Sequence, residues 1–343
     1  MESIFDEESY AKFLRGYTIY DCAINIKDRY CFLLYQEKED REIIPRTRFL
    51  IVLADLPLEQ RFGWFESSEF RFMSFARGVN PPEYVAVDTR SQVYSSNAQR
   101  KGEEKPIDEV IDMKTINSQV GIVTKVVRAA NQVYALGDYR KIYRRIGIEQ
   151  WIELGKEGKG VPLPKDVETG KRYSMSLGFR DMSAFSANDM YAVGGEGDVW
   201  RFDGSKWHNC PIPTDRDLIT VCCAGDGKVY ITEINGTVWV GREDKWKKIA
   251  EADIAFGFGP VDSAWFNNKL YLGAQEGLWA IDAKKKIVLP LGDLDTGAPN
   301  ATNSGRLDLS PDGKYLLTAG SYGACLNDGT GWQRLFSSFD FLD

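Results

Sequence analysis

The sequence predicts an all-β fold made of repeated four-stranded antiparallel sheets. Three observations lead to this prediction: runs rich in β-branched and aromatic residues, turn-forming segments between those runs, and a tyrosine, glycine and tryptophan pattern with a period near 40 residues. The pattern is clearest at Tyr191, Tyr230 and Tyr271, which lie 39 and 41 residues apart.

The clearest copy of the repeat spans residues 181–207 and reads as four short strands separated by three tight turns. Four further copies carry matching residues at similar offsets. They are marked by Tyr230, Trp239 and Trp246; by Tyr271 and Trp279; by Tyr134, Tyr143 and Trp151; and by Tyr315, Cys325 and Trp332. Trp200, Trp239 and Trp279 occupy the same place in successive copies, so we expect them to fill the space between adjacent sheets.

A lone four-stranded sheet cannot bury both of its faces, so the copies must stack on one another, and a period near 40 residues is that of a β-propeller blade. Strand-like segments in the first half bring the count to seven blades. Six remain possible if the first segment is a cap, and the length of 343 residues allows eight at most. We expect one propeller over residues 17–343, preceded by a helical segment, residues 1–16, that is capped by Asp6, ended by Gly16 and packed against the propeller edge.

The repeats resemble WD-repeat, kelch and bacterial neuraminidase-type propellers. The segments Asp203-Gly204-Ser-Lys-Trp207 and Asp328-Gly329-Thr-Gly-Trp332 are similar to degenerate aspartate-box turns. The chain lacks the Gly-His and Trp-Asp pairing of WD repeats and a kelch double glycine in every copy, and its aspartate box is incomplete. The resemblance implies the fold and leaves the function open.

Composition indicates a globular protein with an acidic surface. The chain has 50 acidic and 43 basic residues and a formal net charge of −7, which favours a basic protein partner over nucleic acid. The first eight residues are acidic where a secretory signal is basic, and no apolar run is long enough to cross a bilayer. We therefore expect a cytoplasmic protein that does not contact a membrane and is monomeric apart from its partner, with its six cysteines reduced.

No arrangement of residues in the sequence indicates catalysis. His208 is the single histidine, which excludes a multi-histidine metal site, and the Gly-rich segment 194–197 lies between two strands rather than before a helix. A neuraminidase-like enzyme would need an arginine cluster and a tyrosine nucleophile, but Arg180 and Arg306 have no recurring counterparts. We therefore expect no enzyme activity, no cofactor and no metal.

The links between blades and the hairpins between second and third strands emerge on the same face of a propeller. This face carries the longest insertions, residues 155–179 and the stretch around Phe256 to Gly259, and long loops on a rigid scaffold often bind partners. The hairpins on the opposite face carry both signs of charge. The residues that we predict to bind a partner are Asp138, Tyr139, Arg140, Asp181, Glu196, Asp198, Glu233, Asp262, Glu276 and Tyr322.

These observations favour a non-catalytic protein-binding propeller. One specific form of this hypothesis is a bacterial immunity protein that neutralises a basic toxin domain through its acidic loop face. A general assembly scaffold is the alternative, followed by a divergent propeller enzyme or a sugar-binding protein.

Overall fold

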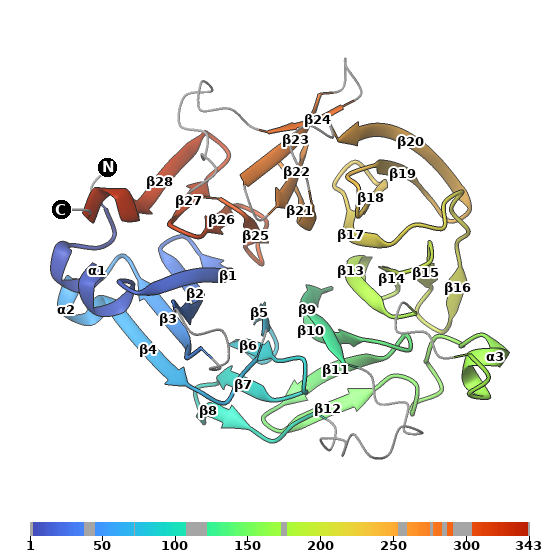
Figure 1. Cartoon of the computed structure of the whole chain (residues 1–343), viewed down its shortest axis with the longest axis horizontal. Helices are drawn as coiled ribbons and strands as arrows, with labels where there is room; N and C mark the ends of the chain where they lie inside the picture. The colour runs from blue at the N-terminus through green and yellow to red at the C-terminus, as the bar shows by residue number, and fades with distance from the viewer. Residues whose placement is uncertain are drawn as a thin grey trace. The chain divides into compact units, whose positions relative to one another are not determined.

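The computed structural model describes residues 3–37, 45–71, 73–107, 122–172, 177–252, 259–274, 277–282, 287–290 and 304–341. Across this part of the chain the fold is a seven-bladed β-propeller, in which each blade is a set of four antiparallel strands in chain order (Figure 1). The predicted fold class and the count of seven blades are confirmed. Of the alternatives that the sequence left open, six and eight blades are excluded.

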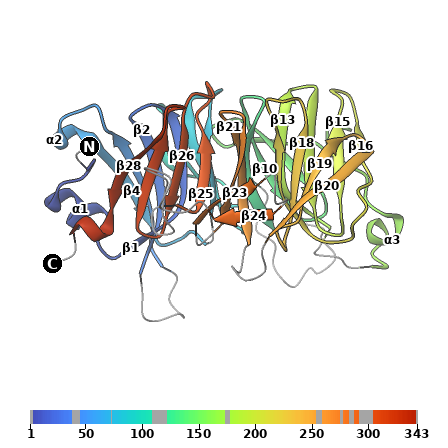
Figure 2. The same ribbon diagram turned by 90° about the horizontal axis from the view of Figure 1, so that it is seen from above.

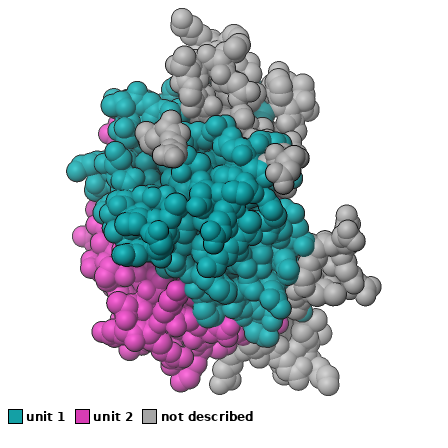
Figure 3. Space-filling view, turned by 90° about the vertical axis from the view of Figure 1, so that its left-hand side faces the viewer, with its two compact units in different colours: residues 1–71, 250–343 teal, residues 72–249 magenta. Residues whose placement is uncertain are grey.

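Contacts between Cα atoms divide the chain into two compact units, coloured separately in Figure 3. Unit 1 comprises residues 1–71 and 250–343, and unit 2 comprises residues 72–249. Separation of a helical segment, residues 1–16, from a single propeller domain stays a prediction.

Unit 2 contains blades 2 to 5, and the last strand of blade 5 extends a few residues past its boundary. Blade 2 is β5 (Ser74–Gly78), β6 (Glu83–Val87), β7 (Val93–Ser96) and β8 (Lys101–Glu104); blade 3 is β9 (Val123–Ala129), β10 (Gln132–Gly137), β11 (Ile142–Gly147) and β12 (Gln150–Glu153). Blade 4 is β13 (Phe179–Ser186), β14 (Asp189–Gly194), β15 (Val199–Phe202) and β16 (Trp207–Asn209); blade 5 is β17 (Leu218–Cys223), β18 (Val229–Glu233), β19 (Val238–Arg242) and β20 (Lys245–Ala252).

Unit 1 contains blades 1, 6 and 7. Blade 1 is β1 (Tyr17–Ile26), β2 (Arg29–Gln36), β3 (Thr47–Leu53) and β4 (Phe62–Ser67); blade 6 is β21 (Pro260–Phe266), β22 (Lys269–Ala274), β23 (Gly277–Asp282) and β24 (Ile287–Pro290). Blade 7 is β25 (Arg306–Leu309), β26 (Leu316–Gly320), β27 (Gly323–Asn327) and β28 (Trp332–Ser337). The short helices are α1 (Glu7–Phe13), α2 (Leu58–Arg61), α3 (Lys165–Glu168) and the 3-10 helix η2 (Ser338–Phe341).

The predicted N-terminal helix is α1, and it begins as the sequence indicates. The Asp6 side chain accepts a hydrogen bond from the Ser9 backbone N–H, and the Ser9 hydroxyl accepts one from the Asp6 N–H, which completes a capping box. The preceding residues join the two ends of the chain within unit 1, because Phe5 stacks on Phe62 of blade 1 and meets Phe336 of blade 7 edge-on, each at 4.9 Å between ring centroids.

Consecutive blades are joined by side chains of their first strands. The Oδ2 atom of Asp181 in blade 4 accepts a hydrogen bond of 2.9 Å from the Val221 N–H of blade 5. In the same way, Asp262 in blade 6 accepts from the Leu307 N–H, Asp308 in blade 7 accepts from the Ile24 N–H, and the Ser74 hydroxyl in blade 2 accepts from the Val126 N–H. Each bond satisfies a backbone donor at a buried interface and fixes how far one blade can slide along the next.

A β-bulge at the same place in several first strands directs these side chains. The register shifts immediately before Asp21, Asp181, Thr220 and Asp262, at each of which the shift leaves one first-strand residue without a partner on the second strand. A bulge re-aims the side chain that follows it. Where that side chain is an aspartate, it lies near a basic residue, as in the Lys125–Asp181 pair at 3.2 Å and the Arg306–Asp21 pair at 3.1 Å.

The repeated tryptophans lie in the core, as predicted. Trp200, Trp239 and Trp279 are each at most 8% exposed. The indole N–H of Trp239 donates a 2.8 Å hydrogen bond to Glu233, and that of Trp200 donates one of the same length to Asp198. Each of these two rings therefore fills the interface while its polar edge is satisfied. The six cysteines are free, in agreement with the prediction of reduced thiols.

A fully buried ion-pair network joins blades 2 and 3. Arg145 on β11 contacts Glu83 at 2.8 Å and Glu104 at 2.7 Å, and the three side chains are fully inaccessible to solvent. Ser95 and the Glu149 N–H also donate to Glu104, so both of its oxygens are used. Burial opposes ionisation, but the hydrogen bonds from Arg145 and Ser95 hold the pKa of Glu104 below its usual value of 4.5.

We predict that Trp239→Ala lowers the free energy of unfolding by about 3–5 kcal/mol, because it removes a large buried ring and leaves Glu233 without one of its donors. Chemical denaturation measures the change. Trp64→Ala is the control, since Trp64 is 49% exposed and its loss should cost roughly 1 kcal/mol or less. Unchanged stability of the Trp239 variant would contradict its assignment to the core.

We also predict that the stabilising effect of Glu104 disappears in acid. Its pKa is lower in the folded than in the unfolded chain, so its contribution is complete above the usual value of 4.5 and is lost as the pH falls through the folded-state pKa. The stability difference between the wild type and Glu104→Gln should therefore narrow below that pH in urea titrations. Glu103→Gln, at an exposed neighbouring position, should run parallel to the wild type throughout.

Candidate binding face

The candidate site in unit 2 is the surface formed by its blade-to-blade links and by its hairpins between second and third strands. We call it the linker face and define it by residues 138–140, 155–172, 196–198, 214–217 and 234–236. In Figure 2 the strands of the unit run between two ends, and α3, which belongs to the insertion of residues 155–172, lies at one of them. The hydrogen bond from the Gly197 N–H to the Arg216 carbonyl joins a hairpin to a link on this face.

The turn between β10 and β11 holds two large side chains in an unfavourable backbone conformation. Tyr139 and Arg140 both have φ of 56°, in the left-handed region that two-residue hairpin turns require and that Asn-Gly normally occupies. Non-glycine residues in this region cost about 1–3 kcal/mol each and persist only where their surroundings fix them. A tyrosine and an arginine at this turn therefore need a compensating interaction.

Arg140 supplies that interaction by reaching the next blade. Its guanidinium makes two hydrogen bonds to the Asp198 carboxylate, of 2.6 and 2.8 Å, and lies 4.8 Å from the centroid of the Trp200 ring. Asp198 also accepts the Trp200 indole N–H. Bidentate arginine–carboxylate pairs are among the strongest and most directional polar contacts, so the hairpins of blades 3 and 4 are tied together.

The insertion between blades 3 and 4 is anchored on the linker face at several points. Arg140 donates to the Pro162 carbonyl, and the Trp207 indole N–H donates to the Lys159 carbonyl at 3.1 Å. Arg172 pairs with Asp166 at 2.8 Å and with Glu196 of the neighbouring hairpin at 3.3 Å. Residues 155–172 therefore form an ordered part of the surface.

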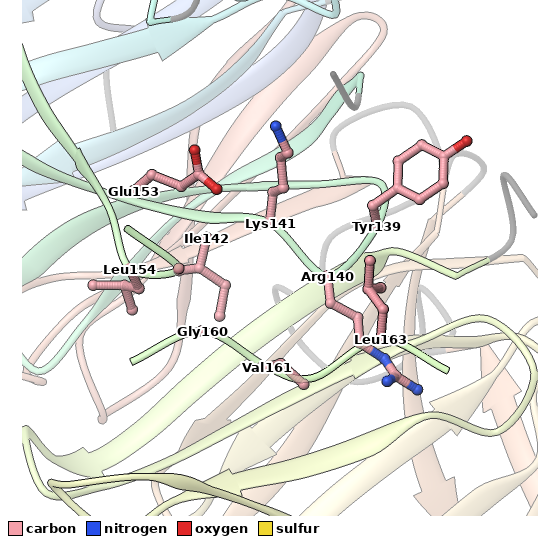
Figure 4. A pocket seen from close by; sticks show the side chains of 10 residues that line it. Tyr139, Arg140, Lys141, Ile142, Glu153, Leu154, Gly160, Val161 and Leu163 are labelled. Atoms are coloured by element: carbon pink, nitrogen blue, oxygen red, sulfur yellow. The ribbon is translucent and has the colours of Figure 1, made fainter. Parts of the chain in front are cut away.

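A pocket lies between this insertion and the turn that bears Arg140. Its volume is about 160 Å³, and its lining is mixed, with the aliphatic residues Ile142, Leu154, Val161 and Leu163 beside the polar residues Tyr139, Arg140, Lys141 and Glu153. Figure 4 shows Ile142 directed toward Val161, with the Tyr139 ring and the Lys141 amine pointing away from that space.

Four of the carboxylates predicted to bind a partner in unit 2 are buried, and their role in binding stays a prediction. Asp138, Asp181, Asp198 and Glu233 are at most 6% exposed. Asp181 joins blades 4 and 5, whereas Asp198 and Glu233 accept tryptophan indoles. Burial raises the pKa of Asp138, although the charge of Arg180 and the Ile122 backbone oppose the rise.

Tyr139, Arg140 and Glu196 are the predicted residues that remain at the surface of unit 2. Glu196 is exposed and Tyr139 is half-buried, whereas the Arg140 side chain is only 8% exposed. Sequence reasoning did not foresee the pair that Arg140 makes with Asp198. The available signal was their opposite charge on corresponding hairpins of consecutive blades.

The predicted residues in unit 1 divide in the same way. Asp262 is 7% exposed and is held by Arg306 at 2.8 Å and by the Leu307 N–H, so it is also a structural residue. Tyr322 is 47% exposed, with its ring 5.9 Å from that of Phe339. Glu276, and Phe256 to Phe258 of the second predicted insertion, lie outside the described residues.

Among the residues placed by the structure, no group of three or more His, Cys, Asp and Glu side chains is arranged to hold a metal ion. No helix in the same part of the chain is long and apolar enough to span a bilayer.

Comparison with solved structures places the chain in the class of β-propellers. The crystal structure of the WD40 β-propeller domain of Doa1 aligns over 92% of this chain and 91% of that one, with a TM-score of 0.54 and 8% identity. YCF48 bound to D1 peptide aligns over 91% of both chains, with a TM-score of 0.55 and 14% identity. At these identities the similarity establishes the fold alone.

A curated relative adds a functional comparison. The chain is 32% identical over 152 residues to the immune protein Tsi7 of Pseudomonas aeruginosa, a match that covers 43% of this chain and 45% of the relative. The matched segment thus spans less than half of either protein. No protein-family model matches the chain.

We predict that Arg140→Gln loosens the linker face. The buried Asp198 carboxylate would lose its cation, and breaking a buried ion pair costs about 3–5 kcal/mol. Hydrogen–deuterium exchange of amides in residues 155–167 should accelerate together with the loss of stability. Arg172→Gln is the matched control, because its ion pairs are solvent-exposed and should contribute no more than about 1 kcal/mol. Equal effects from the two variants would show that the Arg140 pair has no special role.

Proposed function

We propose that this chain is an immunity protein, which binds a protein toxin and neutralises it without catalysis. The observation that carries the proposal is the 32% identity to the immune protein Tsi7 over 152 residues. The propeller fold agrees with such a role, since it presents loops on a rigid scaffold. Because the match covers only 45% of the relative, the identity of the toxin and its chemistry are also proposals.

The linker face of unit 2 is the surface that we assign to the toxin. It combines exposed carboxylates, such as Glu196 and Asp215, with the half-buried Tyr139 on a rigid turn. The insertion that forms part of this face is fixed by Arg140 and Trp207 before any partner arrives. A surface that is already ordered loses little conformational entropy on binding, which favours affinity.

We further propose that the toxin is basic and that the chain acts in the cytoplasm as a monomer apart from this partner. The formal net charge of −7 supports a basic partner, because opposite net charges accelerate encounter. Exposed carboxylates on the linker face would act at this step, whereas the buried ones hold the blades.

Co-expression tests the proposed function directly. We expect the toxin to be encoded beside the gene for this chain; expressed alone it should arrest growth of a sensitive host, and co-expression of the chain should restore growth. Purified chain and inactivated toxin should also form a stoichiometric complex in size-exclusion chromatography. Restoration without a complex would indicate an enzymatic or indirect mechanism, and no restoration would contradict the immunity role.

We predict that the double variant Glu196→Lys and Asp215→Lys slows association with the toxin by roughly three- to tenfold at low ionic strength. Reversal of surface charge acts mainly on the association rate, and the effect should shrink at high salt. Surface plasmon resonance at two salt concentrations measures it. The double variant should remain folded, since exposed charges contribute little to stability.

The matched control is Glu103→Lys with Asp244→Lys, which makes the same change of charge away from the linker face. Both positions are exposed. Asp203 is not used as a control position, because its carboxylate accepts two backbone N–H groups of its own turn and its replacement would disturb folding. Equal slowing by the two double variants would contradict the choice of face.

A further inference from the structure

A hollow lies within unit 1, between the helix α1 and the segment formed by α2 and the start of β4. Its volume is about 310 Å³, roughly twice that of an apolar cavity known to accept benzene, so it has room for a long side chain. Figures 1 and 2 show both helices beside blade 1. We call this space the helix hollow, and its lining includes Glu8, Lys12, Phe13, Leu58, Glu59 and Trp64.

The two walls of the helix hollow are fixed by contacts that need no ligand. Arg48 on β3 donates a 2.8 Å hydrogen bond to the Phe13 carbonyl, which ties the end of α1 to blade 1. Arg61 at the end of α2 donates one of 2.9 Å to the Ile4 carbonyl, just before α1. The rings of Phe13 and Phe62, with centroids 5.0 Å apart, join the two walls directly. The hollow is therefore formed in advance.

One wall of the helix hollow offers exposed apolar surface. Trp64 is 49% exposed and Leu58 is 38% exposed, and both line the hollow. The Arg48 guanidinium lies 5.4 Å from the centroid of the Trp64 ring, so this indole already attracts one cation. Rings and aliphatic groups of this kind suit the apolar stem of a long side chain whose polar end stays near water.

The charged groups of the helix hollow favour a cation. Its lining holds three carboxylates, those of Asp6, Glu8 and Glu59, against one ammonium group, that of Lys12. The Asp6 carboxylate is used by the cap of α1. Glu8 and Glu59 are exposed, and neither makes an ion pair with another residue that the structure describes. An anion would be repelled here, whereas a basic side chain would meet an aromatic ring and two available carboxylates.

We infer that the helix hollow binds an arginine side chain of a basic protein and is a site separate from the linker face. A guanidinium is planar, so it can stack on the Trp64 indole and also donate two hydrogen bonds to one carboxylate, which the ammonium group of lysine cannot do. A peptide-borne arginine fits better than the free amino acid, whose own carboxylate would lie near Glu8 and Glu59. The inference rests on unit 1 alone and goes beyond the immunity role.

Peptide titration tests the site without any toxin. Acetyl-Gly-Arg-Gly-amide, the same peptide with citrulline or lysine in place of arginine, and free L-arginine are added to isotope-labelled chain. NMR follows the indole N–H signals, and Trp64→Phe identifies the Trp64 signal. The arginine peptide should shift that signal in a saturable way and with millimolar affinity, and high salt should weaken the effect. The three other ligands should bind about fivefold more weakly or less well still.

Citrulline has the shape of arginine without its charge, so the comparison isolates the contribution of the carboxylates. Equal binding of the citrulline peptide would overturn the inference. The same holds for tighter binding of lysine peptide or free arginine, and for a Trp64 signal that does not move.

Variants that change the charge in opposite directions provide a second test, followed by saturation transfer to the arginine peptide. Glu59→Gln should weaken binding about three- to tenfold, and Lys12→Gln, which removes the cation of the lining, should strengthen it about twofold. Trp64→Ala should abolish binding while the fold persists, since the ring is half exposed. Glu103→Gln, at an exposed position of unit 2, is the matched control and should change nothing.

The signs of these effects decide the matter. Weaker binding in Lys12→Gln, or equal effects of Glu59→Gln and Glu103→Gln, would contradict a site that reads positive charge. Because no toxin enters these measurements, failure of the immunity role would leave their outcome unaffected, and failure of the arginine site would leave the immunity role intact.

Discussion

The hydrogen bonds between first strands of consecutive blades are the constraint on which each unit depends. A four-stranded sheet leaves apolar surface on both faces, so its stability comes from stacking, and stacking by apolar contact alone permits sliding. A side-chain oxygen that accepts the N–H of the next blade removes that freedom, because misalignment would leave a buried donor unsatisfied. Asp181 and Asp262 do this across two interfaces with the same geometry. The bulge before each of them aims the carboxylate.

Fixed blades make possible the geometry of the linker face. Arg140 can reach Asp198 with both nitrogens only if the hairpins of blades 3 and 4 keep a constant separation, which the Thr124 to Phe179 bond at 2.5 Å helps to set. The same arginine holds the strained turn and the insertion. The buried Arg140 guanidinium therefore fixes the insertion against the aligned blades. Residues 155–172 of this insertion contain one short helix, α3.

Much of the fold could be predicted from the sequence because propeller blades repeat. Recurring Tyr191, Tyr230 and Tyr271 gave the period, and the tryptophans at a fixed place in each copy gave the core. The capping residue Asp6 gave the start of α1. These features can be recognised in one sequence, because they depend on local residue patterns and on the regular recurrence of residues that become buried.

The binding residues were harder to predict, because a turn position does not reveal which way its side chain points. Asp138, Asp198 and Glu233 lie in or beside hairpins that face the surface, yet their carboxylates turn inward. Asp181 and Asp262 recur at one place in two blades, and recurrence is the signature of a structural role. The repeated tryptophans Trp200, Trp239 and Trp279 recur in the same way and are likewise structural.

Burial also changes what the net charge means. The formal charge of −7 counts every carboxylate equally, but Glu83, Glu104, Asp181, Asp198 and Asp262 are paired inside the protein and project little field into solvent. The insertion on the linker face, residues 155–172, carries five basic and three acidic residues, so this face is more mixed than the sequence total suggests. Charge alone would then be a weak basis for a long-lived complex, since exposed pairs are solvated and screened by salt. On such a surface, affinity depends on how little order is lost on binding, and the hydrogen bonds that Arg140 and Trp207 make to residues 159 and 162 keep the insertion ordered in advance.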